Sequence, residues 1–342
     1  MKFDTVMVVG AGAFGTSIAS VLANNFKKVI LKVRSEDVYQ SIKAGENAVY
    51  LPGLKLAKNI TAALTWEEFD AQCGGELELI VSGLPTAGIK TFFSDNHQRF
   101  ESLFKRGIPL CSLSKGIDPD TLEFSDDLFF DIFPDYKEFF TFLSGPSFAR
   151  EIMNKEITAV SVAGRSRIHL QKTAQMLDTS YFKVLLSYDV KGILLGGALK
   201  NILAIAGGII EGLGFNHNTR AAMITRGIAE MLRFGKVFNA RPETFYGLSG
   251  MGDLILTTTG DLSRNKSFGI EISKGRSAQQ IIQSQRTVVE GYKTAKAAYL
   301  LAEKYAIKAT IFHGVYSVLY ANKNPREVIQ KLLKMPSRFE IE

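Results

Sequence analysis

The stretch MVVGAGAFGTSIASVLA, residues 7–23, decides the fold of this chain. It joins an apolar, strand-like run to a helical pattern through three glycines spaced as GxGxxG. In such a unit Gly10 permits the tight turn, Gly12 lets a pyrophosphate approach the backbone, and Gly15 lets the helix pack closely on the strand. The first turn of the helix offers free N–H groups and the positive end of its dipole. The stretch therefore predicts a dinucleotide-binding turn.

Short β-rich runs alternate with helical patterns as far as residue 187, which is typical of a parallel α/β sheet. The expected strands are Thr5–Val9, Lys28–Val33, Leu77–Ser82, Ile108–Ser112, Thr141–Leu143, Ala159–Val162 and Phe182–Leu186. Beyond them only helices are expected, at Asp189–Glu211, Thr219–Phe234, Ser277–Gln285, Tyr292–Lys304 and Pro325–Lys334. We predict a Rossmann-type, doubly wound parallel sheet in a dinucleotide-binding domain, residues 1–187, and an all-helical substrate-binding and catalytic domain, residues 188–342.

Arg34 follows the second predicted strand, at the position whose side chain distinguishes NAD from NADP. An acidic residue there binds the ribose of NAD, whereas an arginine accommodates the extra phosphate of NADP. Glu36 lies two residues further on and keeps NAD as an alternative. We therefore expect NADP or NAD as the cofactor, with a preference for NADP as the hypothesis.

The composition narrows the class of partner. The 342 residues carry a net charge of +7, spread along the chain without a basic tail, which favours anionic small molecules. No groove-reading module is recognisable, so we expect no nucleic-acid partner, and we predict no metal site. The two cysteines, Cys73 and Cys111, are too few for a disulfide framework and indicate a reducing, cytoplasmic location.

Lys200 is the most informative residue of the second half. It lies with Asn201 at the centre of GILLGGALKNILAIAGGII, residues 192–210, which is nearly long enough to span a bilayer. A lysine there would cost about 2.5–3.5 kcal/mol in a membrane, so we expect a buried core helix and no membrane span. Burial lowers the pKa of a lysine, and such an amine can act as a general acid or base near neutral pH. The alternative is a lysine whose amine reaches the surface.

Four other motifs place polar groups where a ligand is expected. Lys115 follows the fourth expected strand, at the sheet edge where open α/β sheets bind ligands, although alone it could be a solvated loop residue. SGPSFA, residues 144–149, offers backbone N–H groups and a hydroxyl to an anion. LSGMGDL, residues 248–254, carries the carboxylate of Asp253. Residues 263–265, Ser-Arg-Asn, could grip a phosphate or simply begin a capped surface helix.

Together these motifs resemble those of the NAD(P)-dependent glycerol-3-phosphate dehydrogenase family of the bacterial type. The similarity extends from Gly10 to about Glu290. Its segments are YLPGLKLAKNI (50–60), SLSKGI (112–117), SGPSFARE (144–151), LGGALKNILAIA (195–206), NTRAAMITRGIAEM (218–231), GLSGMGDLILTTT (247–259), SRNKSFG (263–269) and VVEG (288–291). Each segment is weak singly, and their order and spacing together are specific.

The resemblance implies a reversible hydride transfer between NAD(P)H and dihydroxyacetone phosphate, giving sn-glycerol 3-phosphate for phospholipid synthesis, by a homodimer. It implies that Lys200 exchanges the proton, beside Lys115 and Asp253. The implied substrate contacts are Lys115, Gly145, Ser147, Lys200, Asp253, Ser263, Arg264 and Asn265. The implied cofactor contacts, with the glycines of the turn, are Gly10, Gly12, Ala13, Phe14, Gly15, Arg34, Lys115, Ala149, Arg264, Val288 and Glu290. Ala13 and Phe14 depart from the family's usual serine and tryptophan.

Two other functions remain as alternatives. A β-hydroxyacid or ketopantoate-type dehydrogenase shares the architecture but would lack the full Ser-Arg-Asn and Gly-Met-Gly-Asp-Leu set. An NAD(P)-binding sensor without turnover would have no need of both Lys115 and Lys200. A sugar-nucleotide dehydrogenase would require a nucleophilic cysteine in the second domain, and both cysteines precede it.

Overall fold

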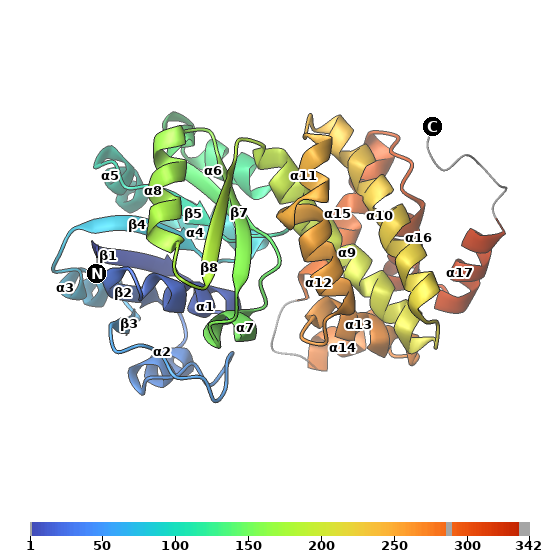
Figure 1. Ribbon diagram of the computed structural model, residues 1–342, viewed down its shortest axis with the longest axis horizontal. Helices are drawn as coiled ribbons and strands as arrows, with labels where there is room; N and C mark the ends of the chain where they lie inside the picture. The colour runs from blue at the N-terminus through green and yellow to red at the C-terminus, as the bar shows by residue number, and fades with distance from the viewer. Residues whose placement is uncertain (1, 285–288, 335–342) are drawn as a thin grey trace.

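The computed structural model describes residues 2–284 and 289–334. A twisted sheet fills the first half of the chain and a helical bundle the second, side by side along the long axis of the molecule (Figure 1). The sheet has the strand order β3-β2-β1-β4-β5-β6-β7-β8. Its strands are β1 (Phe3–Val9), β2 (Phe26–Lys32), β3 (Ile60–Ala63), β4 (Leu77–Ser82), β5 (Leu110–Ser112), β6 (Phe140–Ser144), β7 (Thr158–Gly164) and β8 (Phe182–Ser187). The Rossmann-type fold class is thereby confirmed.

The sheet departs from the prediction at β7, which pairs antiparallel with β6, Thr141 opposite Gly164, while the other neighbours pair parallel. A parallel crossover needs a dozen or more residues, usually with a helix that runs the length of the sheet. The connection from β6 to β7 holds only the five-residue helix α7 (Ala149–Met153), so the chain turns back along its neighbour. β3, with four residues, was not among the expected strands.

Helices cover both faces of the sheet, and strand residues alternate between the two cores. Val6 and Val8 face one core, and Met7 and Val9 the other. The second core is rich in interlocked phenylalanine rings, such as Phe93 on Phe129 at 5.0 Å between centroids. The helices of this half are α1 (Ala13–Leu22), α2 (Glu36–Lys43), α3 (Trp66–Gln72), α4 (Thr86–Asp95), α5 (His97–Lys105), α6 (Ser125–Ile132), α7 and α8 (Arg167–Leu177).

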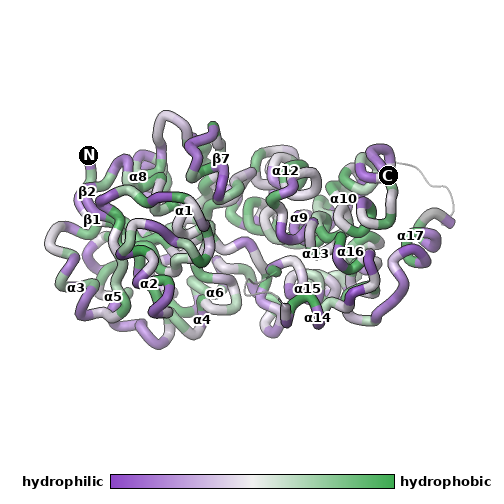
Figure 2. Tube along the Cα trace, turned by 90° about the horizontal axis from the view of Figure 1, so that it is seen from below, coloured by the Kyte–Doolittle hydropathy of each residue, from purple (hydrophilic) through white to green (hydrophobic). Residues whose placement is uncertain are grey.

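The second half is built around the 23-residue helix α9 (Val190–Gly212). Figure 2 shows it at the centre of the bundle, among α10, α12, α13 and α15. The surrounding helices are α10 (His217–Val237), α11 (Pro242–Tyr246), α12 (Asp253–Thr259), α13 (Arg264–Ser273), α14 (Ala278–Ser284), α15 (Glu290–Lys304), α16 (Thr310–Tyr320) and α17 (Pro325–Leu333). Among the described residues α9 alone has the length and hydropathy of a membrane span, but its apolar window is entirely buried inside the protein. The expected core helix is confirmed.

Close packing of α9 requires glycine on both sides of its contact with α13. A Cβ atom on Gly208 would lie 2.0 Å from the carbonyl oxygen of Lys266, and one on Gly269 would lie 2.1 Å from that of Ile205. The two backbones therefore touch, and this fixes the start of α13, with residues 263–265, beside α9. The core of the helical half is continuous with the phenylalanine-rich core of the sheet, so the two halves abut without a linker.

Candidate active site

The glycine-rich turn has the geometry that its sequence predicts. Gly10 adopts φ +94°, and a Cβ atom on Gly15 would lie 2.2 Å from the carbonyl oxygen of Gly10. No atom lies within 4 Å of the position that a Cβ on Gly12 would take, so the backbone is open there. Gly12 precedes α1 without a side-chain cap, and Ala13 is the first residue of that helix. Uncapped N–H groups beside open backbone fit a pyrophosphate.

Three charged side chains meet where the sheet and the bundle join. The Lys200 Nζ on α9 donates a hydrogen bond to Oδ1 of Asp253 at 2.7 Å, and the Lys115 Nζ donates to Oδ2 at 2.9 Å. The side chains of Asp253, Lys200 and Lys115 are 2%, 9% and 11% exposed, so all three charges are largely desolvated. One carboxylate thus holds two ammonium groups, one from each half of the chain.

Burial sets the protonation behaviour of this cluster. Desolvation lowers the pKa of Lys200, and the charge of Asp253 opposes this effect while that of Lys115 adds to it. Desolvation alone would raise the pKa of Asp253, but Lys115 and Lys200 together bring it below the ordinary value. Asp253 is therefore an anion, and the cluster carries one excess positive charge while Lys200 is protonated. A phosphate ester, or loss of the Lys200 proton, relieves that excess.

Two residues outside the predicted set complete the surroundings of Lys200. Thr257 lies one turn after Asp253 on α12, and its Oγ1 accepts a hydrogen bond from the Lys200 Nζ at 2.9 Å. Asn201 follows Lys200 and donates to the backbone oxygen of Lys115 at 3.3 Å. Both had a signal in the sequence: a threonine four residues after the carboxylate, on the same helix face, and an amide in the middle of an apolar helix.

The loop after β6 brings Gly145 and Ser147 to Lys115. Gly145 adopts φ +143°, and its carbonyl oxygen accepts hydrogen bonds from the Lys115 Nζ at 3.0 Å and from the Ser147 Oγ at 2.8 Å. A Cβ atom on Gly145 would lie 3.0 Å from the Cα of Val160, so glycine is required there. The Ser147 Oγ also lies 3.4 Å from the Lys115 Nζ. The structure therefore joins these three predicted residues in one hydrogen-bonded group.

The Ser-Arg-Asn motif begins α13 and faces the same region from the bundle. Ser263 caps the helix, its Oγ accepting from the backbone N–H of Lys266. The Asn265 Nδ2 donates to the Oδ1 of Asn201 at 2.9 Å, which links the motif to α9. Arg264 is exposed and makes no ion pair with the residues that the structure describes. An uncommitted guanidinium at this helix start suits an anionic ligand.

The remaining residues predicted to contact the cofactor lie on the sheet side or at the start of α15. The Lys115 Nζ lies 5.2 Å from the ring centroid of Phe14, so the glycine-rich turn reaches the charged cluster. Arg34 is exposed between β2 and α2, and Ala149 begins α7, which packs against α1. Glu290 begins α15, close enough to act on the pKa of Lys200. Val288 falls outside the described residues.

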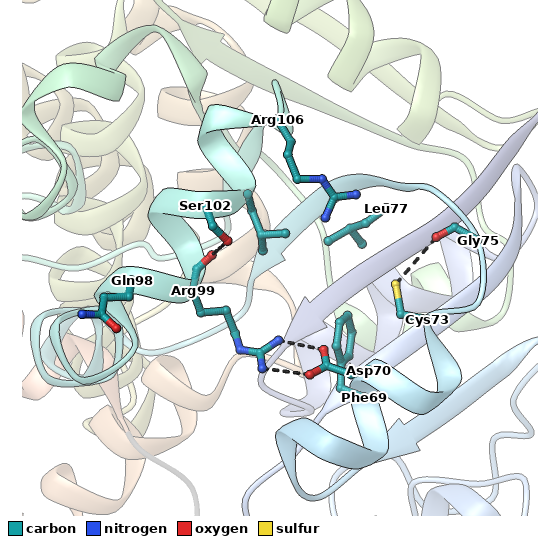
Figure 3. A pocket seen from close by; sticks show the side chains of 10 residues that line it. Phe69, Asp70, Cys73, Gly75, Leu77, Gln98, Arg99, Ser102 and Arg106 are labelled. Carbon is teal, nitrogen blue, oxygen red and sulfur yellow. Dashed lines mark hydrogen bonds and ion pairs between the residues drawn. The ribbon is translucent and has the colours of Figure 1, made fainter.

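A separate surface pocket of about 460 Å³ lies between α3 and α5 (Figure 3). Arg99 and Asp70 form an ion pair on one side of it, and Arg106 extends over the other side. Leu77, which begins β4, lines this pocket, so the pocket lies at the amino end of that strand. Lys115 of the charged cluster follows the carboxyl end of β5, at the opposite edge of the sheet. The pocket contains none of the predicted site residues.

Comparison with known proteins gives one consistent family. A family model described as the NAD-dependent glycerol-3-phosphate dehydrogenase N-terminus matches residues 5–169, and the model of the C-terminus matches residues 189–330. A glycerol-3-phosphate dehydrogenase [NAD(P)+] of Citrifermentans bemidjiense is 41% identical, over 96% of this chain and 97% of that protein. The crystal structure of glycerol-3-phosphate dehydrogenase from Coxiella burnetii has a TM-score of 0.87 at 30% identity, over 98% of this chain and 99% of that chain. The chain belongs to the NAD-dependent glycerol-3-phosphate dehydrogenase family.

Proposed function

We propose that this protein is an NAD(P)-dependent glycerol-3-phosphate dehydrogenase, which interconverts dihydroxyacetone phosphate and sn-glycerol 3-phosphate. The observation that carries the proposal is the carboxylate of Asp253 held between Lys115 and Lys200, next to a glycine-rich turn with open backbone. A buried amine of lowered pKa serves proton exchange on a carbonyl or alcohol oxygen, and excess positive charge serves a phosphate ester. The relatives of the same name, similar over nearly the full length, support the same assignment.

The open backbone at Gly12 and the uncapped start of α1 fit the pyrophosphate of a dinucleotide. Arg34, Ala149 and Glu290 are then further contacts of the cofactor. When bound, the nicotinamide exchanges a hydride with C2 of the substrate. An arginine after β2 suits the 2′-phosphate of NADP, so we infer that NADPH is preferred over NADH.

The chain's own groups act on the substrate oxygen and the phosphate. In the reductive direction Lys200, as the ammonium, stabilises the negative charge that develops on the C2 oxygen and gives it a proton. In the oxidative direction the neutral amine takes that proton back. Asp253 orients Lys200, and Thr257 accepts a second hydrogen bond from it. Lys115 contacts the substrate from the sheet side, with Gly145 and Ser147 behind it.

Arg264 and Asn265, with the Ser263 cap, are proposed to hold the phosphate. Because these residues would bind the phosphate away from the reacting carbon, the binding energy of the phosphate can be used to position the substrate. In this proposal residues 1–187 bind the dinucleotide and residues 188–342 supply the proton donor and the phosphate site. We further infer a homodimer and a cytoplasmic location, the latter supported by two free cysteines and the former by the family resemblance. The product serves glycerophospholipid synthesis.

The test is the loss of NADPH absorbance, and separately of NADH absorbance, on addition of dihydroxyacetone phosphate to the purified protein. The proposal predicts rapid loss with the phosphate ester and a rate at least about a hundredfold lower with unphosphorylated dihydroxyacetone, because the phosphate contacts are then unused. Bound nucleotide without turnover would contradict the proposed activity and favour a sensor. Equal use of NADPH and NADH would contradict the role of Arg34.

A further inference from the structure

A second charged group crosses from the sheet half to the helical half, away from the proposed active site. Lys191, the second residue of α9, donates from its Nζ to Oδ1 of Asp126 at 2.8 Å and to both carboxylate oxygens of Asp127 at 2.6 Å. Both aspartates lie in the first turn of α6, which belongs to the sheet half. The side chain of Asp126 is 3% exposed and that of Lys191 is 25% exposed. The carboxylate of Asp126 is therefore buried, and Lys191 is partly buried beside it.

Lys191 is not needed to cap α6. Oδ2 of Asp127 already accepts a hydrogen bond from the backbone N–H of Phe124, and acidic residues in the first turn are favoured by the helix dipole. Burial raises the pKa of Asp126, so the site disfavours the charge that Lys191 requires of it. Replacing a buried ion pair by an apolar contact is often neutral or stabilising, so a gain in stability does not by itself account for this pair.

The first turn of α9 is also fixed to its own half. Asp189 accepts hydrogen bonds from the backbone N–H groups of Gly192 and Arg241, at 3.0 and 2.8 Å, and from Oγ1 of Thr244 at 2.6 Å. Lys191 then ties the same turn to α6, and its Nζ lies 4.9 Å from the ring centroid of Phe124. A rotation of one half against the other about residues 187–190 must break the hydrogen bonds of Lys191.

The same helix carries Lys200 into the charged cluster. Lys200 lies nine residues after Lys191, which is about 14 Å along the axis and two and a half turns, so the two lysines lie on opposite faces of α9. At the far contact, Asp253 of the helical half meets Lys115 of the sheet half, and Asn201 meets the backbone of Lys115. These are two polar contacts of α9 with the sheet half, which the helix also meets by packing against β6 and β7. The angle of α9 at the first contact therefore bears on the distances at the second.

We propose that Lys191, held by Asp126 and Asp127, is a positioning residue that fixes the angle between α9 and the sheet and so keeps Lys200 and Asp253 in register with Lys115. It contacts no reacting group. The expected effect of Lys191 on turnover rests on the proposed function. The alignment of Lys200 and Asp253 with Lys115 does not depend on that function. A misplacement of reacting groups by about 1 Å can lower a rate by roughly a hundredfold.

The experiment compares Lys191→Met, which keeps the length and apolar stem without the charge, with Lys191→Arg and with the control Lys183→Met. Lys183 forms an exposed ion pair with Asp178 on the edge strand β8. We expect Lys191→Met to lower kcat for dihydroxyacetone phosphate at least about tenfold, with the NADPH dissociation constant within about twofold of wild type. We expect Lys191→Arg to recover most of kcat, and Lys183→Met to match wild type.

A second readout does not depend on turnover. Hydrogen exchange should quicken in peptides around residues 113–117 and 253–258 of Lys191→Met, while β1 stays protected as in wild type. If Lys191→Met does not fold, Asp127→Asn, at a carboxylate with 36% exposure, takes its place and should show both effects more weakly. Introducing Lys191→Met into Asp126→Asn/Asp127→Asn should lower kcat no further.

Three results would overturn the proposal. The first is a kcat for Lys191→Met within about twofold of wild type, and the second is a loss of NADPH affinity in parallel with kcat. The third is unchanged exchange around residues 113–117 and 253–258. Absence of turnover in the wild-type protein would instead contradict the proposed function, and the exchange experiment would still decide whether Lys191 sets the register.

Discussion

Burial removes Lys200 and Asp253 from water and thereby changes the pKa of Lys200. A lysine with 9% of its side chain exposed is tolerable because one carboxylate and one hydroxyl accept its hydrogen bonds. Desolvation and the neighbouring Lys115 keep the pKa of Lys200 below its ordinary value. Asp253 works against both effects, so its charge sets how far the pKa falls.

The effect of the Asp253 charge on the pKa of Lys200 predicts how the rate of reduction depends on pH. Reduction requires Lys200 as the ammonium, so kcat/KM for dihydroxyacetone phosphate should fall as pH rises through the lowered pKa of Lys200. Asp253→Asn removes the charge that raises this pKa, so its falling limb should lie at lower pH than in wild type, with a rate reduced by about a hundredfold or more. Superimposable limbs in pH profiles of the two enzymes would contradict the assigned coupling.

Thr257 offers a test with a control at the next residue. Thr257→Val keeps the shape but removes the oxygen that accepts from Lys200, and kcat should fall about tenfold, as expected for a hydrogen bond to a charged group. Thr258→Val is the matched control, because the hydroxyl of Thr258 is also buried but bonds to the backbone of Leu254 and Ile255. Steady-state kinetics of both variants would settle the point. An equal loss of kcat in both variants would mean that Thr257 contributes only through packing.

At the scale of elements, α16 depends on a group from another helix. Glu230 of α10 is buried, and its carboxylate accepts from the backbone N–H groups of Ile311 and Phe312 at the start of α16. Ala309, the residue before that helix, has no side chain that could cap it. Burial nevertheless outweighs these hydrogen bonds and raises the pKa of Glu230 to about 7.

Because the pKa of Glu230 is raised, we expect the free energy of unfolding to depend on pH. Between the ordinary pKa of a glutamate and about 7 the folded state binds more protons at Glu230 than the unfolded state, so the free energy of unfolding should fall as pH rises through this window. The loss should approach roughly 3 kcal/mol. Urea unfolding from pH 5 to pH 8 should therefore show a steeper fall for wild type than for Glu230→Gln. Glu243→Gln, at an exposed site, is the control and should keep the wild-type slope.

α16 was also absent from the predicted elements, for a physical reason. Thr310–Tyr320 is rich in β-branched and aromatic residues, whose intrinsic helix propensity is low, and it contains Gly314. The segment is helical because Phe312, Val315, Val318 and Leu319 bury one face in the bundle. Tertiary packing of this kind leaves little local signal. By contrast, the long apolar pattern at α9 predicted its helix to within two residues at each end.

At the scale of the whole molecule, the sequence predicted the Rossmann-type half and the helical half, and the structure joins Lys115, Lys200 and Asp253, which are predicted to be catalytic, in one charged cluster. These were predictable because a glycine-rich turn between a strand and a helix, and a charge inside an apolar helix, are each compatible with few structures. The sequence did not predict β3 or the reversal of β7, because a four-residue strand and the direction of a short crossover depend on the sheet they join. It did not single out Lys191, whose partners Asp126 and Asp127 are distant in sequence. It also missed Thr257, although this residue lies one helical turn after Asp253.

The site is therefore a property of the assembled molecule. Lys115 reaches it from the sheet, Lys200 and Asp253 from the bundle, and the Ser-Arg-Asn motif from a helix packed on α9 through glycine. We propose that this assembly places the Lys200 amine at the substrate's C2 oxygen as the proton donor. The resemblance to relatives supports the reaction as a whole, whereas the role of this amine is a statement about one group.

The most direct measurement is the kcat of Lys200→Ala for NADPH-dependent reduction of dihydroxyacetone phosphate, with NADPH binding measured in parallel by fluorescence. We predict a loss of about 10²–10⁴-fold or more in kcat, because both the proton donor and the charge on the developing oxyanion disappear. The NADPH dissociation constant should stay near the wild-type value, since the glycine-rich turn lies in the other half. A kcat within about tenfold of wild type would contradict the assigned role of Lys200.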